Sequence, residues 1–571
     1  MRSPGLANGP ERRTDWDTVN WRSAHRNVRN LRRRIFRATR AGDIKKVRSL
    51  QKLMLRSYSN ILISVRRVTQ TNAGRNTPGV DRIVVKTPRA RGELVDLLAI
   101  FQPWRSRPVR RVYIPKSNGK QRPLGIPCVI DRCLQAMVKN ALEPEWEARF
   151  EGSSYGFRPG RGCHDAITKV YLICSARGRK RLALDADIQG AFDNIDQNFL
   201  LETIGQVPGR ELLRQWLKAG VLEDGVFHET PLGTPQGGVI SPLLLNIALH
   251  GMEAALGVQQ TASGRTKGKR AVVRYADDEV VFCASEKDAR RAKEELSTWL
   301  AERGLTLSEE KTRIVHLAEG FDFLGFNVRQ YPCPRTTRTG RKLLIRPSKK
   351  SVQAVRKKLR QAWLELKGQN IHAVLYRLNP IIRGWANYFR TGVSSRVFHK
   401  LDHWMHLRAV RYAQRTHPTK SREWRRQRYW GQLNPESKDR WVFGATRPNK
   451  KTGRHHYLLK FSWFKIERHR LVKGTSSPDD ASLREYWWER RRVNIRCLDP
   501  GDVDLANDQD WVCPICGQEL INGEPLERHH KTARSEGGSE ARANRVLVHL
   551  YCHQQETAAW RKGRRMSQER S

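Results

Sequence analysis

The sequence predicts a multi-domain α+β protein, and three observations support this fold class. At the usual 100–200 residues per domain, 571 residues correspond to about three to five domains. Hydrophobic residues make up 38% of the chain and include 17 Trp, 13 Tyr and 16 Phe, enough to form several buried cores. Segments whose apolar residues have helical spacing are interleaved with short apolar runs that are typical of strands.

The charge of the chain predicts a polyanionic partner. Lys and Arg total 107 against 57 Asp and Glu, which gives a formal net charge of +50. No run of 18 or more apolar residues occurs, and the positive charge is spread along the chain instead of lying on one amphipathic helix. Both features favour a nucleic acid over a membrane surface as the partner. Ten cysteines are too few for a disulfide framework, so we expect a reducing compartment.

The first 70 residues are strongly basic, with 18 Lys and Arg against 4 acidic residues. Apolar residues recur at helical intervals between residues 16 and 67, which predicts two basic amphipathic helices. We expect these helices to contact RNA, and solvated helix faces are the alternative. The next element is a predicted hairpin over residues 109–126, because Asn-Gly separates two apolar runs there. Lys116 and Arg122 would be basic side chains on this hairpin.

The following elements are predicted from the same periodicities. Turn residues and acids separate them from one another. We expect a helix over residues 131–148, a glycine-rich loop over 153–162, a buried strand over 181–188, an apolar helix over 241–256, a hairpin over 271–283, a helix over 287–303, a strand over 321–328 and helices from 348 to 390.

Acidic residues stand at the ends of two predicted strands. Asp277 and Asp278 lie in a tight turn between valine-rich strands, so a hairpin presents two adjacent carboxylates. Asp185 and Asp187 are two residues apart on the other strand and therefore face the same side. Two Mg²⁺ ions would offset the repulsion among these carboxylates and would support nucleotidyl transfer. An ordinary acidic surface turn is the alternative for the Asp277 and Asp278 pair alone.

The motifs around these acids resemble the palm of reverse transcriptases. They are Tyr275-Ala-Asp-Asp, Asp187-Ile-Gln-Gly-Ala-Phe-Asp and Gly233-Thr-Pro-Gln-Gly-Gly-Val-Ile-Ser-Pro. Residues 74–81, 114–127 and 154–166 are similar to the finger and palm blocks of group II intron-encoded reverse transcriptase/maturases. The resemblance covers residues 70–390. It implies a right-hand polymerase whose fingers and palm contain antiparallel sheet and whose thumb is α-helical.

The resemblance also implies roles for individual residues. Asp187, Asp277 and Asp278 would bind the two Mg²⁺ ions, with Asp185 as a supporting acid. Four residues would bind the incoming dNTP: Lys116 and Arg122 at its triphosphate, Phe192 against its sugar, where a 2′ hydroxyl is rejected, and Gln236 in the nucleotide pocket. The structural alternatives are a solvated finger for Lys116, core packing for Phe192 and an ordinary loop residue for Gln236.

The region after the palm interleaves basic and aromatic residues. Arg383, Trp385, Tyr388 and Phe389 recur at helical spacing, and we expect Trp385 and Phe389 to belong to the core. The stretch resembles the thumb, or maturase domain, of the same family, which implies binding of the intron RNA through residues such as Arg383 and Tyr388. Residues 416–495 would then match the family's DNA-binding region, mainly because of their position in the chain.

The C-terminal segment carries a zinc-site pattern followed by a nuclease-like pattern. Cys513-x₂-Cys516 and His549-x₂-Cys552 have the spacing of a closed tetrahedral Zn²⁺ site. The residues between and after these pairs resemble the HNH endonuclease signature, whose module has a ββα-metal fold. The resemblance implies that His530 is the general base, that His529 and His553 hold a catalytic divalent ion and that Asn544 orients the site. A binding-only zinc ribbon is the alternative, and the assignment of His549 and His553 to the two metals stays open.

Together these features predict a multifunctional group II intron-encoded protein acting as a ribonucleoprotein in the bacterial cytoplasm or an organelle. It would bind intron RNA and promote its splicing, nick a double-stranded DNA target and copy RNA from the nick with dNTPs. A homodimer is a candidate oligomeric state. A non-catalytic splicing cofactor and a retron-type or diversity-generating polymerase are the competing classes. The predicted regions are a basic N-terminal extension (1–70), fingers and palm (71–345), thumb (346–415), DNA-binding region (416–495) and HNH domain (496–571).

Overall fold

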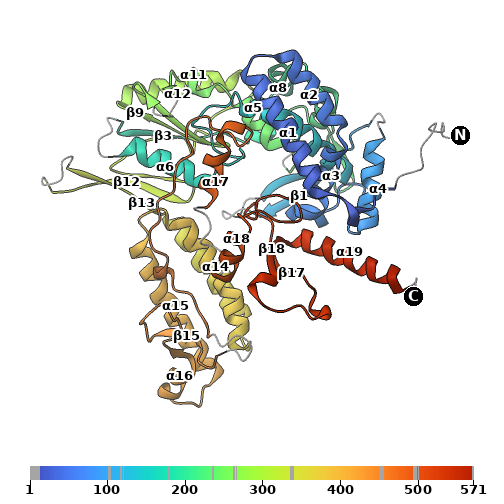
Figure 1. The fold of residues 1–571 in the computed structure, drawn as a ribbon. Coiled ribbons are helices and arrows are strands. Elements are labelled where there is room, and N and C mark those ends of the chain that lie inside the picture. Colours follow the sequence, from blue (N-terminus) through green and yellow to red (C-terminus); the bar gives the residue numbers. More distant parts are fainter. Residues whose placement is uncertain are drawn as a thin grey trace.

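The structure is a computed structural model that describes most of residues 13–568 (Figure 1). The segments left out within this range are 101–103, 116–118, 120, 176–179, 235–236, 262–263, 265, 335–339, 449–454, 493–497 and 499. None of the described helices is long and apolar enough to cross a membrane.

The N-terminal segment forms three helices and not the expected two. They are α1 (Trp21–Arg40), α2 (Ile44–Arg56) and α3 (Tyr58–Arg66), and they pack on α5 (Val129–Glu147). Asn20 and Asp43 cap the first two helices through their side chains. Ser57 has an extended backbone, with ψ of 117°, and this single residue separates α2 from α3. The helical periodicity continues across this break, which explains why the sequence pattern did not reveal it.

The segment predicted to form the fingers contributes a four-stranded sheet in the order β2-β1-β4-β5. The predicted hairpin is confirmed: β1 (Val109–Pro115) and β2 (Gln121–Ile126) are antiparallel, with Ile114 opposite Arg122. The other two strands are β4 (Val221–Glu223) and β5 (Val226–His228), and β4 runs parallel to β1. Arg122 is exposed on β2, whereas Lys116 lies outside the described residues.

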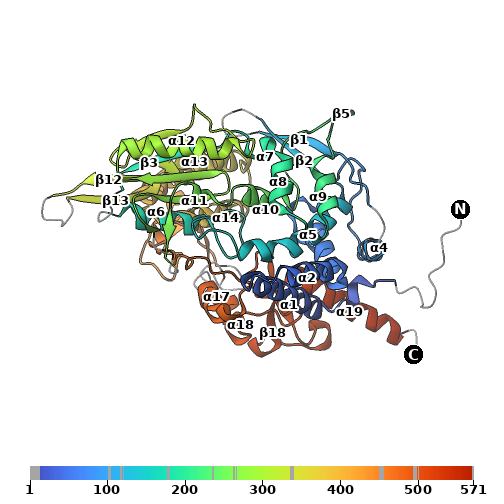
Figure 2. The ribbon, with the colours of Figure 1, turned by 90° about the horizontal axis from the view of Figure 1, so that it is seen from above.

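The palm is an antiparallel sheet that is covered on both faces (Figure 2). Its strand order is β10-β3-β9-β8, and α6 (Cys163–Cys174), α10 (Ser241–Ala248) and α12 (Glu286–Ala301) pack around it. Ala183, Val280 and Phe282 belong to one hydrophobic core, and the alternating residues Leu184 and Val281 belong to a second core. The strands are β3 (Leu182–Asp187), β8 (Ala271–Tyr275), β9 (Asp278–Cys283) and β10 (Arg313–His316).

Two predicted elements are divided in the structure. The helix expected over 241–256 consists of α10 and α11 (Met252–Ala255), separated by Gly251 with a φ of 97°. The strand expected over 321–328 consists of β11 (Phe321–Phe323) and β12 (Phe326–Pro332), joined by a tight turn at Leu324 and Gly325. Both turn residues have positive φ, as a two-residue hairpin turn with the mirror-image geometry requires. The strand β13 (Arg341–Pro347) completes this second sheet.

The segment predicted to form the thumb consists of long helices that extend away from the palm sheet (Figure 1). These are α13 (Lys349–Glu365), α14 (Ile371–Phe389) and α15 (Ser395–Thr416). Phe389 is buried and Trp385 packs partly buried against the same core, in agreement with the expectation for both residues. Beyond the thumb lie α16 (Arg422–Tyr429) and a small sheet of β14 (Trp430–Gly431), β15 (Val442–Ala445) and β16 (His456–Tyr457).

The C-terminal module packs against the N-terminal helices, so the two ends of the chain share one core (Figure 1). Trp16, Trp21 and Val65 belong to this shared core together with Leu520 and Cys552. Polar contacts also join the two parts: an Arg22 guanidinium nitrogen donates to the Pro514 carbonyl (2.9 Å), and the Tyr551 hydroxyl donates to the Gln70 carbonyl (2.6 Å). The elements of this module are α18 (Pro500–Asp508), β17 (Leu526–His530), β18 (Arg545–His549) and α19 (Leu550–Gln568), preceded by α17 (Arg484–Arg492).

We predict that Trp21→Ala destabilises this shared core. Trp21 is 3% exposed, and deletion of a buried Trp side chain costs roughly 3–5 kcal/mol. Denaturant unfolding followed by far-UV circular dichroism should show this loss, and limited proteolysis should release the C-terminal module earlier. The matched control is Trp441→Ala, whose side chain is 52% exposed. Equal stability of the two variants would contradict the shared core.

Candidate functional site

The register of the palm sheet brings carboxylates of two strands together. Asp187, the last residue of β3, is paired with Asp278, the first residue of β9. On the other side of β9, Asp278 is paired with Tyr275, so Ala276 and Asp277 form the turn of the β8–β9 hairpin. Asp185 lies two residues before Asp187 on the same side of β3, and its neighbour on β10 is Arg313. The structure therefore brings the four predicted acids to one end of the sheet.

The turn that carries Asp277 has an unusual backbone and is held from two sides. Ala276 has a φ of 60°, at the position where two-residue turns of this kind normally have glycine. The buried guanidinium of Arg274 donates to the Ala276 carbonyl (3.3 Å) and to the Asn246 side-chain oxygen (3.1 Å). A Cβ on Gly156 would lie only 2.2 Å from the Ala276 nitrogen, so only glycine allows this loop to contact the turn.

The carboxylates lack sufficient positive charge nearby. Burial, and then the neighbouring Asp277 and Asp187, raise the pKa of Asp278 to about 6. Burial likewise raises the pKa of Asp185 to about 6, although Arg313 lowers it. Lys311 is the cation that contacts the group directly, with its Nζ 2.7 Å from Asp187 Oδ2. This lysine is a site residue that the sequence analysis did not single out, although it lies within residues 70–390, over which the chain resembles the family.

Three of these four acids line a cleft of about 970 Å³ beside the palm sheet. Asp185, Asp187 and Asp278 are joined in its lining by Lys311 and Asp322, among others. Carboxylate oxygens are the ligands that Mg²⁺ prefers, and unneutralised carboxylates of raised pKa are the environment that a divalent cation would relieve. The donor set therefore fits a magnesium site, although the ligand atoms are less tightly gathered than those of the Cys/His group described below.

The predicted nucleotide-pocket residues are described in part. Phe192 lies half-buried on α7 (Ala191–Asn194), and its ring contacts the Phe157 ring edge-on, with centroids 6.4 Å apart. The Thr234 backbone nitrogen donates to the Phe192 carbonyl (2.6 Å), which connects α7 to the loop that begins with Gly233 and Thr234. Gln236, like Lys116, lies outside the described residues. Arg122 is exposed, with a position on β2 that leaves its guanidinium free to reach a ligand.

The two predicted thumb residues lie in different surroundings. Arg383 is exposed on α14. Tyr388 is half-buried at the junction between thumb and palm, where its hydroxyl donates to the Leu324 carbonyl (2.9 Å) and its ring stacks on Phe326. Tyr388 therefore joins α14 to the β11–β12 turn.

Four side chains of the C-terminal module form a candidate metal centre. Cys513, Cys516, His549 and Cys552 are buried, and their ligand atoms lie within 4.8 Å of one another. The His549 Nε2 lies 3.1 Å from the Glu519 carbonyl and donates to it, so Nδ1 faces the sulfurs. Three thiolates and one imidazole suit a closed tetrahedral Zn²⁺ site. The structure thus places His549 with the cysteines, which the sequence had left open.

A positive charge from the N-terminal region contacts this metal centre. An Arg66 guanidinium nitrogen of α3 lies 3.3 Å from Cys552 Sγ and 3.2 Å from Glu524 Oε2. Its guanidinium also lies over the Trp21 ring, 4.7 Å from the centroid. Arg66 is 4% exposed, so it supplies a buried charge next to a thiolate ligand. No sequence signal links Arg66 to the cysteines, because they lie almost 500 residues apart.

The HNH-like residues lie on the β17–β18 hairpin and on α19. The rings of His529 and His553 are 5.1 Å apart. Glu527 lies two residues before His529 on the same face of β17, and its Oε2 is 2.6 Å from His553 Nδ1. Burial and then His553 lower the pKa of His529, which favours the neutral imidazole that binds a cation. The sequence analysis missed Glu527, for which the spacing Glu-x-His on a strand was the available signal.

The other two HNH-like residues flank the loop between the strands. His530 is half-buried, and its Nε2 lies 3.5 Å from Glu540 Oε1. The Asn544 side chain accepts from the Thr532 backbone nitrogen (2.9 Å) and donates to the Thr532 and Ser539 carbonyls (3.2 and 2.9 Å). Asn544 therefore fixes the loop that follows His530.

Four family models match successive parts of the chain. Residues 16–98 match the N-terminal domain of reverse transcriptase, and residues 114–328 match reverse transcriptase (RNA-dependent DNA polymerase). Residues 352–430 match the maturase-specific domain of group II introns, and residues 513–559 match HNH endonuclease.

Curated relatives extend this result. Protein YkfC of Escherichia coli is 36% identical over 330 residues, which are 50% of this chain and 85% of YkfC. The group II intron-encoded protein LtrA of Lactococcus lactis is 34% identical over 284 residues, 39% of this chain and 47% of LtrA. The chain belongs to the group II intron-encoded proteins. Maturase-like protein 1 of Euglena gracilis is 24% identical over 378 residues, 65% of this chain and 76% of that protein.

This group II intron-encoded protein combines three activities in one chain. The matched domains establish a reverse transcriptase, a maturase domain that implies binding of intron RNA, and an HNH endonuclease. The predictions of the family and of both enzyme classes are thereby confirmed. The polymerase-like arrangement of sheet and helices and the Cys/His metal site agree with the expected fold class at this coarser level.

We predict that Asp278→Asn stabilises the protein in magnesium-free buffer at pH 7.5. The pKa of Asp278 is about 6 in the folded state and near 3.8 when unfolded, so its ionisation opposes folding above pH 6. Because this side chain is partly exposed, we expect a gain on the order of 1 kcal/mol. Thermal unfolding at pH 7.5 and pH 5 should show a smaller gain at pH 5, where Asp278 is mostly protonated. A gain that does not change with pH would contradict the raised pKa.

Proposed function

We propose that Asp187, Asp277 and Asp278 hold two Mg²⁺ ions and that the palm copies RNA into DNA at this point. The pairing of Asp187 with Asp278 across β3 and β9 is the observation that carries this assignment. When bound, the ions would activate the primer 3′ hydroxyl and stabilise the leaving pyrophosphate. Asp185 supports the site from its position two residues before Asp187, and Lys311 neutralises Asp187 in the metal-free protein.

Residues of the fingers and of α7 would bind the incoming dNTP. Arg122, and with it Lys116, would place positive charge at the triphosphate, because the planar guanidinium and the ammonium both suit phosphate oxygens. Phe192 would close against the sugar and reject a 2′ hydroxyl. The half-buried ring of Phe192 beside Phe157 supports this role, since a packed aromatic ring gives a fixed steric boundary. Gln236 would line the same pocket.

The C-terminal module would nick the DNA target with the residues of the β17–β18 hairpin and α19. His529 and His553 would hold one divalent ion, and Glu527 would orient His553 through their 2.6 Å contact. His530 would deprotonate water, and Asn544 would keep the loop after His530 in place. Cys513, Cys516, His549 and Cys552 would hold a structural Zn²⁺ ion, which supplies folding energy and no reactive position.

These activities would act in sequence on an intron ribonucleoprotein. The protein would bind its intron RNA through basic surfaces, including the exposed Arg383 of the thumb, and promote splicing. Tyr388 would support this surface from the thumb–palm junction. The HNH module would cut double-stranded DNA, and the palm would extend the resulting 3′ end with dNTPs. We propose the boundaries 1–70, 71–345, 346–415, 416–495 and 496–571 for the regions that perform these steps.

A non-catalytic splicing cofactor is the second candidate. Such a protein would keep the fold only to bind RNA, and carboxylates exposed to RNA phosphates would then weaken binding. The clustering of Asp185, Asp187, Asp277 and Asp278 at one end of the palm sheet favours the polymerase instead.

We predict that Asp277→Ala abolishes cDNA synthesis and leaves splicing largely intact. We expect at least a loss of about a hundredfold in primer extension, equivalent to about 3 kcal/mol of transition-state stabilisation. The measurement is extension of a labelled primer on an RNA template, together with a splicing assay of the intron RNA. Glu309→Ala, an exposed acid outside the sheet, is the matched control. Loss of splicing in Asp277→Ala alone would show that the acids serve folding or RNA docking.

We predict that His530→Ala loses DNA nicking and retains reverse transcription. The general base contributes roughly a hundredfold to ten-thousandfold to such reactions. The assay is cleavage of a labelled duplex that contains the intron insertion site, with primer extension measured on the same preparation. His403→Ala, an exposed thumb histidine, controls for the loss of an imidazole. Unchanged cleavage in His530→Ala would overturn the nuclease assignment.

A further inference from the structure

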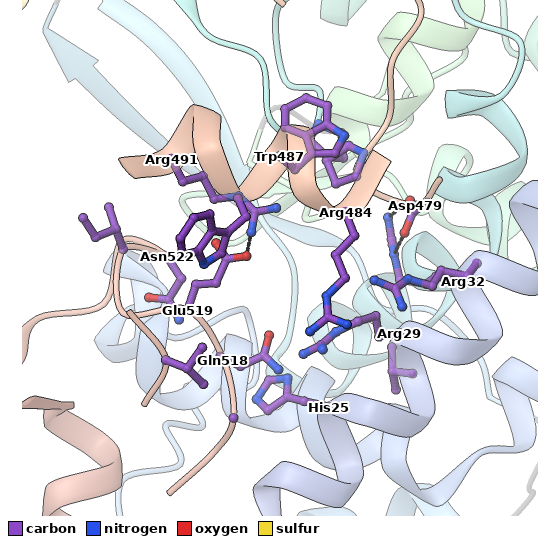
Figure 3. Close-up of a pocket in the computed structure, with 18 of the residues that line it drawn as sticks. His25, Arg29, Arg32, Asp479, Arg484, Trp487, Arg491, Gln518, Glu519 and Asn522 are labelled. Atoms are coloured by element: carbon purple, nitrogen blue, oxygen red, sulfur yellow. Dashed lines mark hydrogen bonds and ion pairs between the residues drawn. The ribbon is translucent and has the colours of Figure 1, made fainter. Parts of the chain in front are cut away.

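A large cavity lies where several parts of the chain meet, apart from the palm carboxylates and from the HNH residues (Figure 3). Its volume is about 1380 Å³. Its walls come from α1, from residues 63–67, from residues 139–143 of α5, from the loop 157–159, from the segment 478–491 that includes most of α17, and from residues 509–522 of the C-terminal module. Figure 3 shows arginines of α1 and of α17 extending into this space from opposite sides.

Most acids of the cavity are already paired. Arg32 contacts both Glu143 and Asp479, at 2.9 and 2.7 Å. Glu519 is paired with Arg491. These contacts neutralise the charges on opposite walls of the cavity. The arginines at its centre are a different set.

Arg29, Arg33 and Arg484 form that central set, called here the arginine cluster. Among the residues that the structure describes, no carboxylate lies within ion-pairing distance of these three guanidinium groups. Arg29 and Arg33 lie on α1 and Arg484 lies on α17, and all three residues line the cavity. Figure 3 shows the side chains of Arg29 and Arg484 extending toward each other. Arg29 and Arg33 are half-buried and Arg484 is exposed, so an anion that enters the cavity would offset the repulsion among these three like charges.

Buried hydrogen-bond donors without acceptors also indicate an anion in this cavity. The Arg33 Nε and the Gln518 Nε2 are buried and lack a hydrogen-bond acceptor among the described atoms. The His25 Nε2 is also buried without a partner. All three residues line the cavity, and unsatisfied buried donors cost free energy unless a ligand accepts from them. Oxygen atoms of an anion would satisfy these donors.

Phosphate groups of a nucleic acid strand fit this chemistry better than an isolated small anion. Guanidinium groups bind phosphate oxygens through paired hydrogen bonds. The cavity also has an aromatic edge at Phe157, which is 47% exposed and offers a surface on which a base can stack. The volume of about 1380 Å³ exceeds the roughly 300–1,000 Å³ of ordinary ligand pockets. A segment of several nucleotides would use this space, the cations and the aromatic ring together.

The position of the cavity also suits a strand. Phe157 contacts Phe192 on the polymerase side, and the adjacent Gly156 packs against the turn at Ala276. The opposite wall belongs to the C-terminal module, including Gln518 and Asn522. The cavity therefore borders both enzymatic modules.

We propose that this cavity binds a single-stranded segment of nucleic acid, with phosphates on Arg29, Arg33 and Arg484 and a base against Phe157. This inference rests on the proposed function, because it takes the bound strand to lie between the nuclease module and the polymerase. Binding itself can be measured without either reaction.

The test is binding of a fluorescent 12-nucleotide oligodeoxynucleotide of mixed sequence to the full-length protein, measured by anisotropy over a range of salt concentrations. The triple variant R29A/R33A/R484A should bind at least about tenfold more weakly than the control. Loss of three phosphate contacts should also reduce the slope of log K against log salt by about 2. The control R26A/R34A/R37A removes the same charge from exposed positions of α1. Equal affinities and equal slopes for the two triple variants would overturn the proposal.

Three further measurements keep the test decisive if the triple variant folds poorly. Gln518→Leu, which changes no charge, should weaken oligonucleotide binding by about tenfold because a donor to phosphate is lost. Primer extension on a long preannealed duplex tests the polymerase separately. A variant that binds the oligonucleotide weakly but still extends this primer would show that the polymerase assignment holds. Inorganic tripolyphosphate distinguishes the source of the phosphates: the proposal expects the 12-nucleotide strand to bind more tightly. Equal binding of tripolyphosphate, with no effect of oligonucleotide length, would overturn the strand in favour of a free polyphosphate.

Discussion

The register between β3 and β9 is the constraint on which the polymerase site depends. It sets Asp187 opposite Asp278, and the hairpin turn then adds Asp277. Alternate residues of the same strands enter two different hydrophobic cores, so a slip of one residue would turn apolar side chains to the cleft and acids to the core. The cores thus enforce the geometry of the acids. Arg274 and Gly156 refine it by fixing the backbone of the turn.

Two regions of the molecule contain clustered charges of opposite sign that neighbouring side chains do not fully neutralise. The palm cleft gathers carboxylates whose pKa values are raised, and the cavity beside α1 gathers Arg29, Arg33 and Arg484, which have no carboxylate partner among the described residues. Each arrangement is costly in the isolated chain and is relieved by a ligand of the opposite sign. The net charge of +50 describes the molecule as a whole, but function depends on where that charge is left unpaired.

Local patterns in the sequence were sufficient for much of this architecture. The hairpins over 109–126 and 271–283 and the acid-bearing strand at 181–188 follow from alternation and turn residues, and the structure contains them. The sequence analysis missed the breaks at Ser57, Gly251 and Gly325, because a single backbone angle ends an element without changing the period of its apolar residues. The sequence analysis also missed three site residues, Lys311, Glu527 and Arg66, for a different reason. Their partners are assembled by tertiary contacts, and the distance along the chain is 124 residues for Lys311 and 486 for Arg66.

The core shared by the two ends of the chain has a consequence for synthesis in the cell. Trp16, Trp21 and Val65 leave the ribosome early, yet their partners Leu520 and Cys552 are made about 500 residues later. At about 5–20 residues per second, the N-terminal helices wait roughly 25–100 s with an apolar face uncovered. During that time the face is open to aggregation or to a chaperone, and pairing of such distant segments is intrinsically slow. Completion of the nuclease module is therefore also the last step in folding of the N-terminal helices.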